Sequence, residues 1–377
     1  MAEKKTYDIA AYIWPSYTGD EPRTRIFWEE GYGEWQTVKN VEKNSAKKLD
    51  WYLENWTNRK PLWGYVNEAN ADVMQMQIDC ATSYGVNVFI YDWYWYDKRP
   101  FLENCLNDGF LKAKNNDKMK FYLMWANHDV TYLWDVRNSA NLSNVMWYAA
   151  VGMDEYKQLV ERFITKYFSH PSYYKVNGCP AFMIYDTQNF VKSFGSVEGA
   201  RAALDYFREE VKRAGFPDLH LQFTARSDAA RNYSGVDTPV KENGVHEKLG
   251  ADALTHYQWA HFAKPDGEYS EWAKAAKAEY AKMDERGIPY FPHVSLGWDN
   301  NPRFTGFRVG VIKNATPDKI EEALRVAKDY VDSHELPVPL ITVNSWNEWT
   351  ETSYLEPDTL YGYGYLEAIK KVFVDGE

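Results

Sequence analysis

Cysteine, long apolar runs and clustered basic residues are all scarce in this chain of 377 residues. Its three cysteines, Cys80, Cys105 and Cys179, are too few for a disulfide framework and show no C-x-x-C spacing, so we interpret them as buried thiols. No apolar run reaches the roughly 18 residues of a transmembrane helix, and we expect no membrane span. The amino-terminal residues also lack the apolar segment of a signal peptide. A leader already removed would give the same pattern, so a periplasmic or cell-surface location stays open.

Acidic residues outnumber basic ones: 54 Asp and Glu stand against 43 Lys and Arg, a net charge of −11. This balance, without any block of consecutive basic residues, disfavours nucleic acid and anionic membrane surfaces as partners. The chain also lacks an H-E-x-x-H motif, an EF-hand loop, a P-loop and closely spaced His and Cys residues. We therefore predict no resident metal and no cofactor, although a cleft lined by carboxylates could still capture a divalent cation. We expect a monomer.

Aromatic side chains, in contrast, are abundant. Phe, Trp and Tyr supply 17% of the residues, and the 29 Tyr outnumber the 22 Gly. Glycine ordinarily ranks among the commonest residues of a globular protein. The hydrophobic fraction of 45% already provides for a sizeable core. The aromatic excess therefore calls for an explanation of its own.

Short β-branched and aromatic runs alternate with segments of helical spacing, which predicts a β/α architecture. The eight expected strands span residues 9–15, 86–94, 120–127, 180–186, 219–226, 251–259, 290–298 and 339–346. Expected helices span residues 72–84, 153–168, 197–214, 270–286, 317–333 and 363–373. Eight such alternations favour a (β/α)8, or TIM, barrel. We predict one catalytic domain over residues 1–377, with extended βα loops and a long insertion at about 16–71 after the first strand.

An open, doubly wound sheet is the alternative fold. It would need a glycine-rich phosphate loop after the first strand, but the segment IWPSYTGDEP (13–22) contains a single glycine. A loop rich in Trp and Tyr fits a sugar site better than a dinucleotide site.

The ends of the expected strands carry aromatic residues interleaved with hydrogen-bonding ones. In a TIM barrel the reactive groups lie at these carboxyl ends. Sugar rings stack on aromatic faces, and their hydroxyls need paired donors and acceptors, so the mixture predicts a saccharide cleft. The expected substrate-binding residues are Tyr12, Trp14, Asp92, Trp93, Trp95, Trp125, Asn127, His128, Tyr185, His256, Tyr257, His293, Trp298, Asp299, Trp346 and Asn347. Arg226 ends the fifth strand.

Each of these residues also has a structural interpretation. A single Trp or Tyr can be a large core residue with a polar tip. Asp92 can pair with an arginine, and Asp299 with Arg303 can form a buried ion pair. His256 and His293 can be core histidines whose hydrogen bonds are satisfied inside the protein.

The segment NSWNEWTE (344–351) gives the most specific chemical signal, because it places two glutamates three residues apart after an apolar strand. A helical turn would bring the carboxyl groups of Glu348 and Glu351 to one face. Cleavage of a glycosidic bond needs one carboxyl group that keeps its proton and one that is ionised, and a close pair favours retention of configuration. The Glu-x-x-Glu pattern is common on solvated helices, but the flanking Trp346 and Trp349 are not typical of a solvated face. We predict that both glutamates are catalytic.

The segment NSWNEWTETSYLEPDTLYGYGYLEA (344–368) resembles the signature of glycoside hydrolase family 99-like, or WbsX-type, proteins of polysaccharide gene clusters. Similar stretches occur at residues 61–95, 121–129, 170–186 and 291–303, in the same order over nearly the whole chain. The resemblance implies a TIM barrel that acts on complex glycans.

The family 99 endo-acting α-mannan hydrolases carry a Glu-Trp-His-Glu segment whose glutamates match Glu348 and Glu351. The resemblance implies that Glu348 is the base toward the sugar's own 2-hydroxyl and that Glu351 is the acid and then the base. The intermediate in that family is a 1,2-anhydro sugar. Thr350 stands where the mannan enzymes have His, and His128-Asp129-Val130 stands where WbsX-type relatives often have Glu-Asn-Trp. Both departures point to a changed sugar.

We therefore expect a retaining, endo-acting glycoside hydrolase that cleaves a complex polysaccharide, α-mannan-like or related. Two alternatives stay open. One is a glycosyltransferase of polysaccharide synthesis, a label often attached to WbsX-type proteins, although no Asp-x-Asp metal motif or glycine-rich nucleotide loop is evident. The other is a glycan-binding barrel without catalysis.

Overall fold

Eight parallel strands surround the centre of the molecule in the computed structural model, which describes residues 5–19, 21–41, 59–139, 141–142, 144–226 and 244–376. They are β1 (Asp8–Ile13), β2 (Val88–Tyr96), β4 (Lys120–Trp125), β8 (Cys179–Ile184), β9 (His220–Thr224), β10 (Ala253–Thr255), β12 (His293–Ser295) and β14 (Leu340–Asn344). The order of neighbours is β10-β9-β8-β4-β2-β1-β14-β12. A parallel bridge between Leu254 and Tyr290 joins the two ends of this order, so the sheet is nearly closed.

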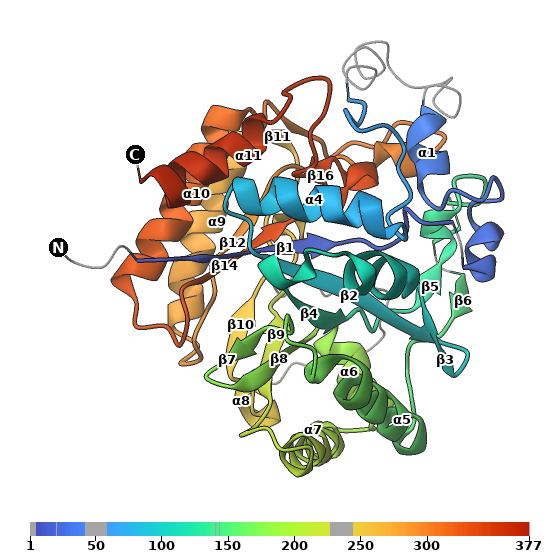
Figure 1. Cartoon of the computed structure of the whole chain (residues 1–377), viewed down its shortest axis with the longest axis vertical. Coiled ribbons are helices and arrows are strands. Elements are labelled where there is room, and N and C mark those ends of the chain that lie inside the picture. The colour runs from blue at the N-terminus through green and yellow to red at the C-terminus, as the bar shows by residue number, and fades with distance from the viewer. Residues whose placement is uncertain are drawn as a thin grey trace.

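Helical segments follow the strands on the outside of the barrel, as Figure 1 shows. They are α4 (Ala71–Ser83), η2 (Cys105–Gly109), η3 (Phe110–Lys112), α5 (Met153–Phe163), η6 (Ile164–Phe168), α6 (Thr187–Ser193), α7 (Val197–Arg213), α8 (Val245–Leu249), α9 (Tyr269–Asp284), α10 (Pro317–Ser333), α11 (Gly364–Ile369) and η11 (Lys370–Asp375). The predicted (β/α)8 barrel is confirmed.

The strands form where apolar runs are buried, and the helices end where local chemistry stops them. All nine residues of β2 are buried, because the barrel covers one face and the helices cover the other. The Asn70 side chain accepts a hydrogen bond from the backbone of Asp72 at the start of α4. Gly85, directly after the α4 C-cap residue, has φ 93, a conformation that side chains disfavour.

Short elements in the βα loops extend the barrel beyond the carboxyl ends of its strands. In Figure 1 the strands run towards the side where α1, β3, β5 and β6 gather. The short elements there and elsewhere are η1 (Pro22–Ile26), α1 (Trp35–Lys39), β3 (Arg99–Phe101), η4 (Asn116–Lys118), β5 (Val130–Thr131), η5 (Tyr132–Trp134), β6 (Val145–Trp147), β7 (Lys175–Val176), η8 (Trp259–His261), β11 (Gly267–Glu268), η9 (Asn301–Arg303), β13 (Ile312–Lys313), β15 (Asn347–Glu348), η10 (Trp349–Glu351) and β16 (Ser353–Tyr354). The expected insertion at 16–71 contains η1 and α1, and its residues 20 and 42–58 lie outside the described residues.

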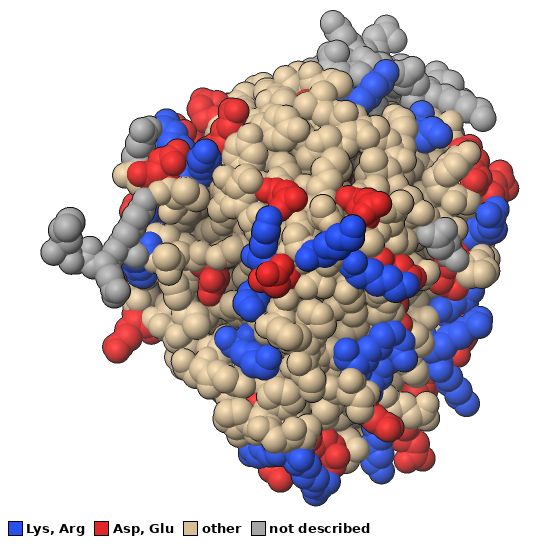
Figure 2. Space-filling view, viewed as in Figure 1, with Lys and Arg blue, Asp and Glu red and all other residues tan. Residues whose placement is uncertain are grey.

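The cysteine prediction is right for one residue only. Cys105 is buried, whereas Cys80 near the end of α4 and Cys179 at the start of β8 are half-buried. Among the described residues, no helix is long and apolar enough to cross a membrane. On the face in Figure 2, Lys and Arg side chains lie among Asp and Glu side chains rather than in one basic stripe.

Candidate active site

The polypeptide leaves β14 into a tight turn that fixes the position of Glu348. Residues Asn347–Glu348 pair antiparallel with Ser353–Tyr354, and a single turn of 3-10 helix joins them. The backbone N–H of Glu348 donates to the Ser345 hydroxyl oxygen at 2.8 Å, and that hydroxyl donates to the Ser353 carbonyl at 2.7 Å. The expected helical turn is thus a 3-10 turn, held by buried hydrogen bonds.

Arg303 binds both predicted catalytic glutamates. Its Nη2 donates to Glu348 Oε1 and its Nη1 donates to Glu351 Oε1, each at 2.7 Å. Its Nε donates to Glu34 Oε1 at 2.9 Å. The side chains of Arg303 and Glu348 are 4% exposed and that of Glu351 is 14% exposed. One guanidinium therefore holds the two carboxyl groups close together, and Glu351 is the more accessible of the two.

Asp92, the fifth residue of β2, adds a fourth carboxyl group. Its Oδ2 accepts a hydrogen bond from the Tyr257 hydroxyl at 2.9 Å, whereas its buried Oδ1 has no hydrogen-bond partner. Burial, together with the negative charge of Glu351, raises the pKa of Asp92 well above its ordinary value. The residue thus offers a buried oxygen whose hydrogen bond is unmade, which is costly unless a ligand or water supplies the partner.

The charges of this cluster do not balance. Three carboxyl groups, those of Glu34, Glu348 and Glu351, are ion-paired with one guanidinium, that of Arg303, and the charge of Asp92 acts on Glu348 as well. Burial raises the pKa of Glu348 well above its ordinary value; the charges of Glu351, Glu34 and Asp92 add to this shift, and Arg303 opposes it. Burial and the charge of Glu34 also raise the pKa of Glu351, again against Arg303. The arrangement favours retention of at least one proton, which general acid catalysis requires.

Aromatic rings surround this cluster at the carboxyl ends of β1, β2, β4, β8 and β10. The ring centroids of Trp14 and Tyr94 lie 5.5 Å apart, those of His128 and Tyr185 lie 5.6 Å apart, and those of Tyr185 and Tyr257 lie 5.2 Å apart. His128 and Tyr185 are partly exposed. These five rings and the carboxyl cluster form what we call the mouth of the barrel.

Four of the predicted tryptophans point away from the mouth, namely Trp93, Trp95, Trp125 and Trp346. Trp93 donates to Glu103 at 2.8 Å and Trp95 donates to Glu155 at 2.6 Å, both on the helical layer outside β2. Side chains alternate along a strand, so Asp92 and Tyr94 face the opposite way. Trp125 packs on Tyr156 and Phe190. Trp346 donates to Gln77 of α4 at 3.2 Å. These side chains join the barrel to its helices.

Asn127 and Asn347 are clamps between neighbouring strands. The Asn127 amide accepts from the backbone N–H of Asp186 at 2.7 Å and donates to its carbonyl at 2.8 Å. Asn347 does the same with Trp14, at 2.8 and 3.0 Å. Both side chains replace backbone partners where the strands diverge, and both are buried.

Tyr12, His256 and His293 lie inside the barrel, fully buried. The two ring nitrogens of His293 contact Thr342 and Ser295 at 2.9 and 3.0 Å. Burial lowers the pKa of His256 to about 3, and its Nδ1 lies 2.8 Å from the Tyr290 hydroxyl. The structure therefore places these residues in the core beneath the mouth.

Trp298 and Asp299 follow β12 beside the turn that carries Glu348 and Glu351. The Asp299 backbone N–H donates to the Glu351 carbonyl at 2.8 Å, and Trp298 is half-buried. The Asp299 side chain accepts two hydrogen bonds from Asn301. Asp299 thereby stabilises the η9 turn. The ion pairs of Arg303 are made with Glu34, Glu348 and Glu351 instead of Asp299.

The sequence interpretation missed Glu34, Tyr94 and the role of Arg303. Glu34 lies in the long insertion, in a segment without a motif, and its carboxylate is fully buried against Arg303 and the Trp14 indole N–H. Tyr94 could have been predicted, because residues two apart on a strand share a face and Tyr94 is two residues from Asp92. Only the tertiary structure brings Glu34 to the site.

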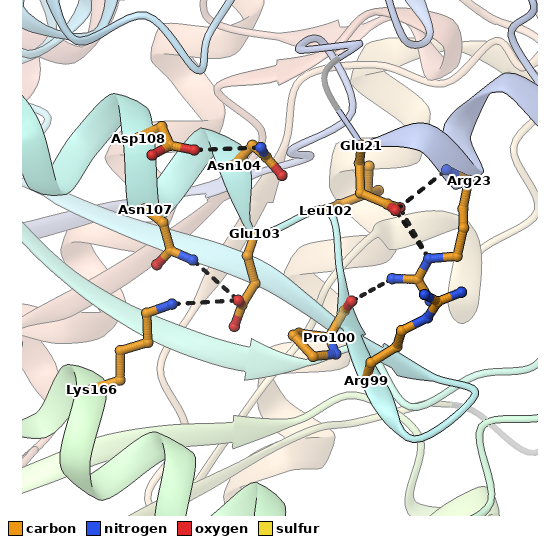
Figure 3. Close-up of a pocket in the computed structure, with 10 residues that line it drawn as sticks. All are labelled: Glu21, Arg23, Arg99, Pro100, Leu102, Glu103, Asn104, Asn107, Asp108 and Lys166. Atoms are coloured by element: carbon orange, nitrogen blue, oxygen red, sulfur yellow. Dashed lines mark hydrogen bonds and ion pairs between the residues drawn. The ribbon is translucent and has the colours of Figure 1, made fainter.

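A separate polar pocket of about 410 Å³ lies outside β2 (Figure 3). It is lined by Glu21, Arg23, Arg99, Pro100, Leu102, Glu103, Asn104, Asn107, Asp108 and Lys166. Glu103 in its wall is ion-paired with Arg162 and Lys166 and accepts the Trp93 indole N–H. None of the mouth residues lines this pocket. In the part of the chain that the structure describes, no group of three or more His, Cys, Asp or Glu side chains is arranged to hold a metal ion.

Comparison with solved structures supports the fold. The chain superposes on the GH99 endo-α-mannosidase of Bacteroides thetaiotaomicron in complex with bis-tris-propane with a TM-score of 0.56, at 12% identity, covering 97% of this chain and 96% of that one. A glycoside hydrolase-like protein gives a TM-score of 0.58 at 14% identity, covering 99% and 95% of the two chains. The fold is therefore that of TIM-barrel glycoside hydrolases.

Sequence comparison identifies the family. The protein WxcX of Xanthomonas campestris pv. campestris strain B100, described as uncharacterised, is 23% identical over 365 residues. The match covers 93% of this chain and 47% of that protein, so the chain spans about half the length of this curated relative. The sequence model of the family described as "Glycosyltransferase WbsX" matches residues 9–369. A match of that extent shows that the chain belongs to the WbsX family.

Proposed function

We propose that this protein is a retaining, endo-acting glycoside hydrolase that cleaves a complex polysaccharide, α-mannan-like or related. The observation that carries the proposal is the binding of Glu348 and Glu351 to one guanidinium, that of Arg303, at 2.7 Å each. Two carboxyl groups held this closely suit a retaining mechanism, whereas inversion needs a wider gap for a water molecule. The fold similarity to glycoside hydrolases and the aromatic rings of the mouth support the same function.

In the proposed first step the Glu348 carboxylate takes the proton of the sugar 2-hydroxyl. The 2-oxygen attacks the anomeric carbon, the glycosidic bond breaks, and the leaving oxygen receives the proton of Glu351. In the second step Glu351 takes a proton from water, which attacks the anomeric carbon and opens the 1,2-anhydro ring. Glu348 returns its proton to the 2-oxygen. Glu351 is the more exposed carboxyl group, which suits its contact with leaving group and water.

A glycosyltransferase is the second candidate, because the family description names that activity. The same carboxyl pair could deprotonate an acceptor hydroxyl in place of water. Titration with nucleotide sugars tests this candidate, and saturable binding of one of them would favour it. Glycan binding without cleavage or transfer would instead favour a binding protein.

Digestion of a panel of bacterial and fungal polysaccharides tests the proposal. We compare the wild type with the variants Glu348→Gln and Glu351→Gln, and we use the exposed Glu335→Gln as the matched control. The expected result is a loss of about 10²- to 10⁴-fold in kcat for both site variants and none for the control. For a substrate with an activated aryl leaving group, Glu351→Gln should recover most of the rate of the first step. Undiminished cleavage by both site variants would refute the assignment.

A further inference from the structure

Arg226 stands just beyond the carboxyl end of β9 and belongs to no step of the proposed chemistry. Its guanidinium carbon lies 4.4 Å from the ring centroid of Tyr185, one of the mouth residues. The side chain is 19% exposed. Burial raises the pKa of Tyr185 to about 12, the charge of Arg226 opposes this shift, and the charge of Glu351 adds to it. Arg226 therefore contacts the wall of the mouth at Tyr185.

The donors of this guanidinium are poorly satisfied. Among the described residues its one charged partner is Asp186, whose Oδ2 lies 3.8 Å from Nη1, too far for a hydrogen bond. The other oxygen of Asp186 is already used, because it accepts the backbone N–H of Asn189 at the start of α6, at 2.9 Å. The buried Nε of Arg226 has no hydrogen-bond partner.

Stacking on Tyr185 occupies a face of the guanidinium and, among the described residues, leaves its edge open. The Tyr185 ring covers its face, whereas all five N–H donors of an arginine lie in its plane and point outward from its edge. The nearby rings of His128 and His261 do not supply an anion, and burial lowers the pKa of both, which keeps them uncharged near pH 7. A buried cation with an unmade donor is costly, so a ligand with a planar anionic group would be favoured at this edge.

We propose that Arg226 binds the carboxylate of an acidic sugar residue, a uronate, next to the sugar that is cleaved. The inference rests on the proposed function for the position of the polysaccharide, and it names the substrate class. The protein as a whole carries a net charge of −11, which repels an anionic polymer. The guanidinium of Arg226, which makes no hydrogen bond to Asp186, supplies the local attraction that such a substrate needs, and its planar fork matches a carboxylate in two parallel hydrogen bonds.

Binding rather than cleavage is the test, so that its failure is distinct from failure of the proposed function. The probes are acidic bacterial exopolysaccharides that contain uronates, each paired with the same polymer after chemical reduction of its carboxylates to alcohols. Calorimetry or affinity electrophoresis compares the wild type, Arg226→Gln, Arg226→Lys and the exposed surface control Arg213→Gln. Thermal unfolding of each variant verifies that it is folded.

We expect at least one acidic polymer to bind the wild type more tightly than its reduced form. Arg226→Gln should weaken that binding about 10- to 100-fold and leave the reduced polymer unaffected. Arg226→Lys should be intermediate, because it keeps the charge and loses the fork. Arg213→Gln should bind as the wild type does. The proposal is overturned if no acidic polymer is preferred over its reduced form, or if Arg226→Gln weakens both forms equally, whichever glycans the wild type cleaves.

Discussion

Glu34 and Arg303 form a buried ion pair across 269 positions of sequence, with 2.9 Å between Glu34 Oε1 and Arg303 Nε. Glu34 also accepts the Trp14 indole N–H, so its carboxylate ties the insertion after β1 to both the mouth and the η9 turn. Arg303 in turn holds Glu348 and Glu351. The insertion thus contributes directly to the positions of both predicted catalytic groups.

Removal of Arg303 should therefore destabilise the protein strongly. Arg303→Met leaves three buried carboxyl groups without their cation, and we expect the free energy of unfolding to fall by about 3–5 kcal/mol. Denaturant unfolding measures it. Adding Glu34→Gln to Arg303→Met removes one of the unpaired charges and should recover part of the loss. A double variant no more stable than Arg303→Met would contradict this account of the coupling.

Asp92 should control the pH dependence of catalysis. Its negative charge contributes to the raised pKa of Glu348, which must be ionised to act as the base. Asp92→Asn removes that charge, so the pKa of Glu348 falls and the acidic limb of kcat/KM should move to lower pH. A pH profile of kcat/KM checks the shift, with the exposed Asp72→Asn as control. An unmoved limb would argue against Glu348 as the base.

A second buried carboxyl pair should make stability depend on pH. Gln77 Nε2 donates to Glu68 at 3.2 Å and to Glu356 at 2.8 Å. Burial raises the pKa of Glu68 to about 7 and, with the charge of Glu68, raises that of Glu356 well above its ordinary value. In the unfolded chain both ionise near pH 4.3. The folded state thus holds protons that the unfolded chain releases, so stability should fall as pH rises from about 4.3 to above 7.

Glu356→Gln isolates that contribution. The amide can still accept the Trp349 indole N–H that Glu356 accepts now, while the repulsion with Glu68 disappears. We expect a smaller decrease in the free energy of unfolding between pH 5 and 8 than in the wild type, measured by urea unfolding at each pH. If the free energy of unfolding changed equally with pH in the two proteins, the Glu68–Glu356 pair would not be the source of the pH dependence.

Trp95 tests whether the side chains of β2 point to the helical layer or to the mouth as the structure places them. Because it points to the helical layer and donates to Glu155, Trp95→Phe should cost about 1 kcal/mol of stability and leave kcat/KM unchanged. Urea unfolding and steady-state kinetics measure the two effects. A large loss of kcat/KM with unchanged stability would place the Trp95 ring at the substrate instead.

Much of the architecture follows from local sequence. The alternation of apolar strands with helical periodicity predicts the barrel, because each strand must bury both faces and each helix only one. Helix ends follow likewise, as at Gly85, where a positive φ suits glycine. The pair Glu348 and Glu351 is also readable, since their spacing and the flanking tryptophans are local features.

Two kinds of feature at the strand ends needed the tertiary structure. Aromatic residues at strand ends look alike in sequence, but parity sends Trp93 and Trp95 outward and Asp92 and Tyr94 inward, and a shift of one residue in the predicted end exchanges the two faces. From sequence alone, an amide side chain such as that of Asn127 looks like one that binds sugar. Only the structure shows that it bonds the backbone of a neighbouring strand end.

The sequence by itself determined the barrel, its family resemblance and the two glutamates, because these depend on residues that are neighbours along the chain. The tertiary structure decided which groups surround those glutamates. Glu34 and Arg303 come from two loops and Asp92 from β2, all far apart in sequence, and their common burial makes their charges interact strongly. Long-range electrostatics of this kind depends on distance and desolvation, neither of which leaves a local pattern in the sequence.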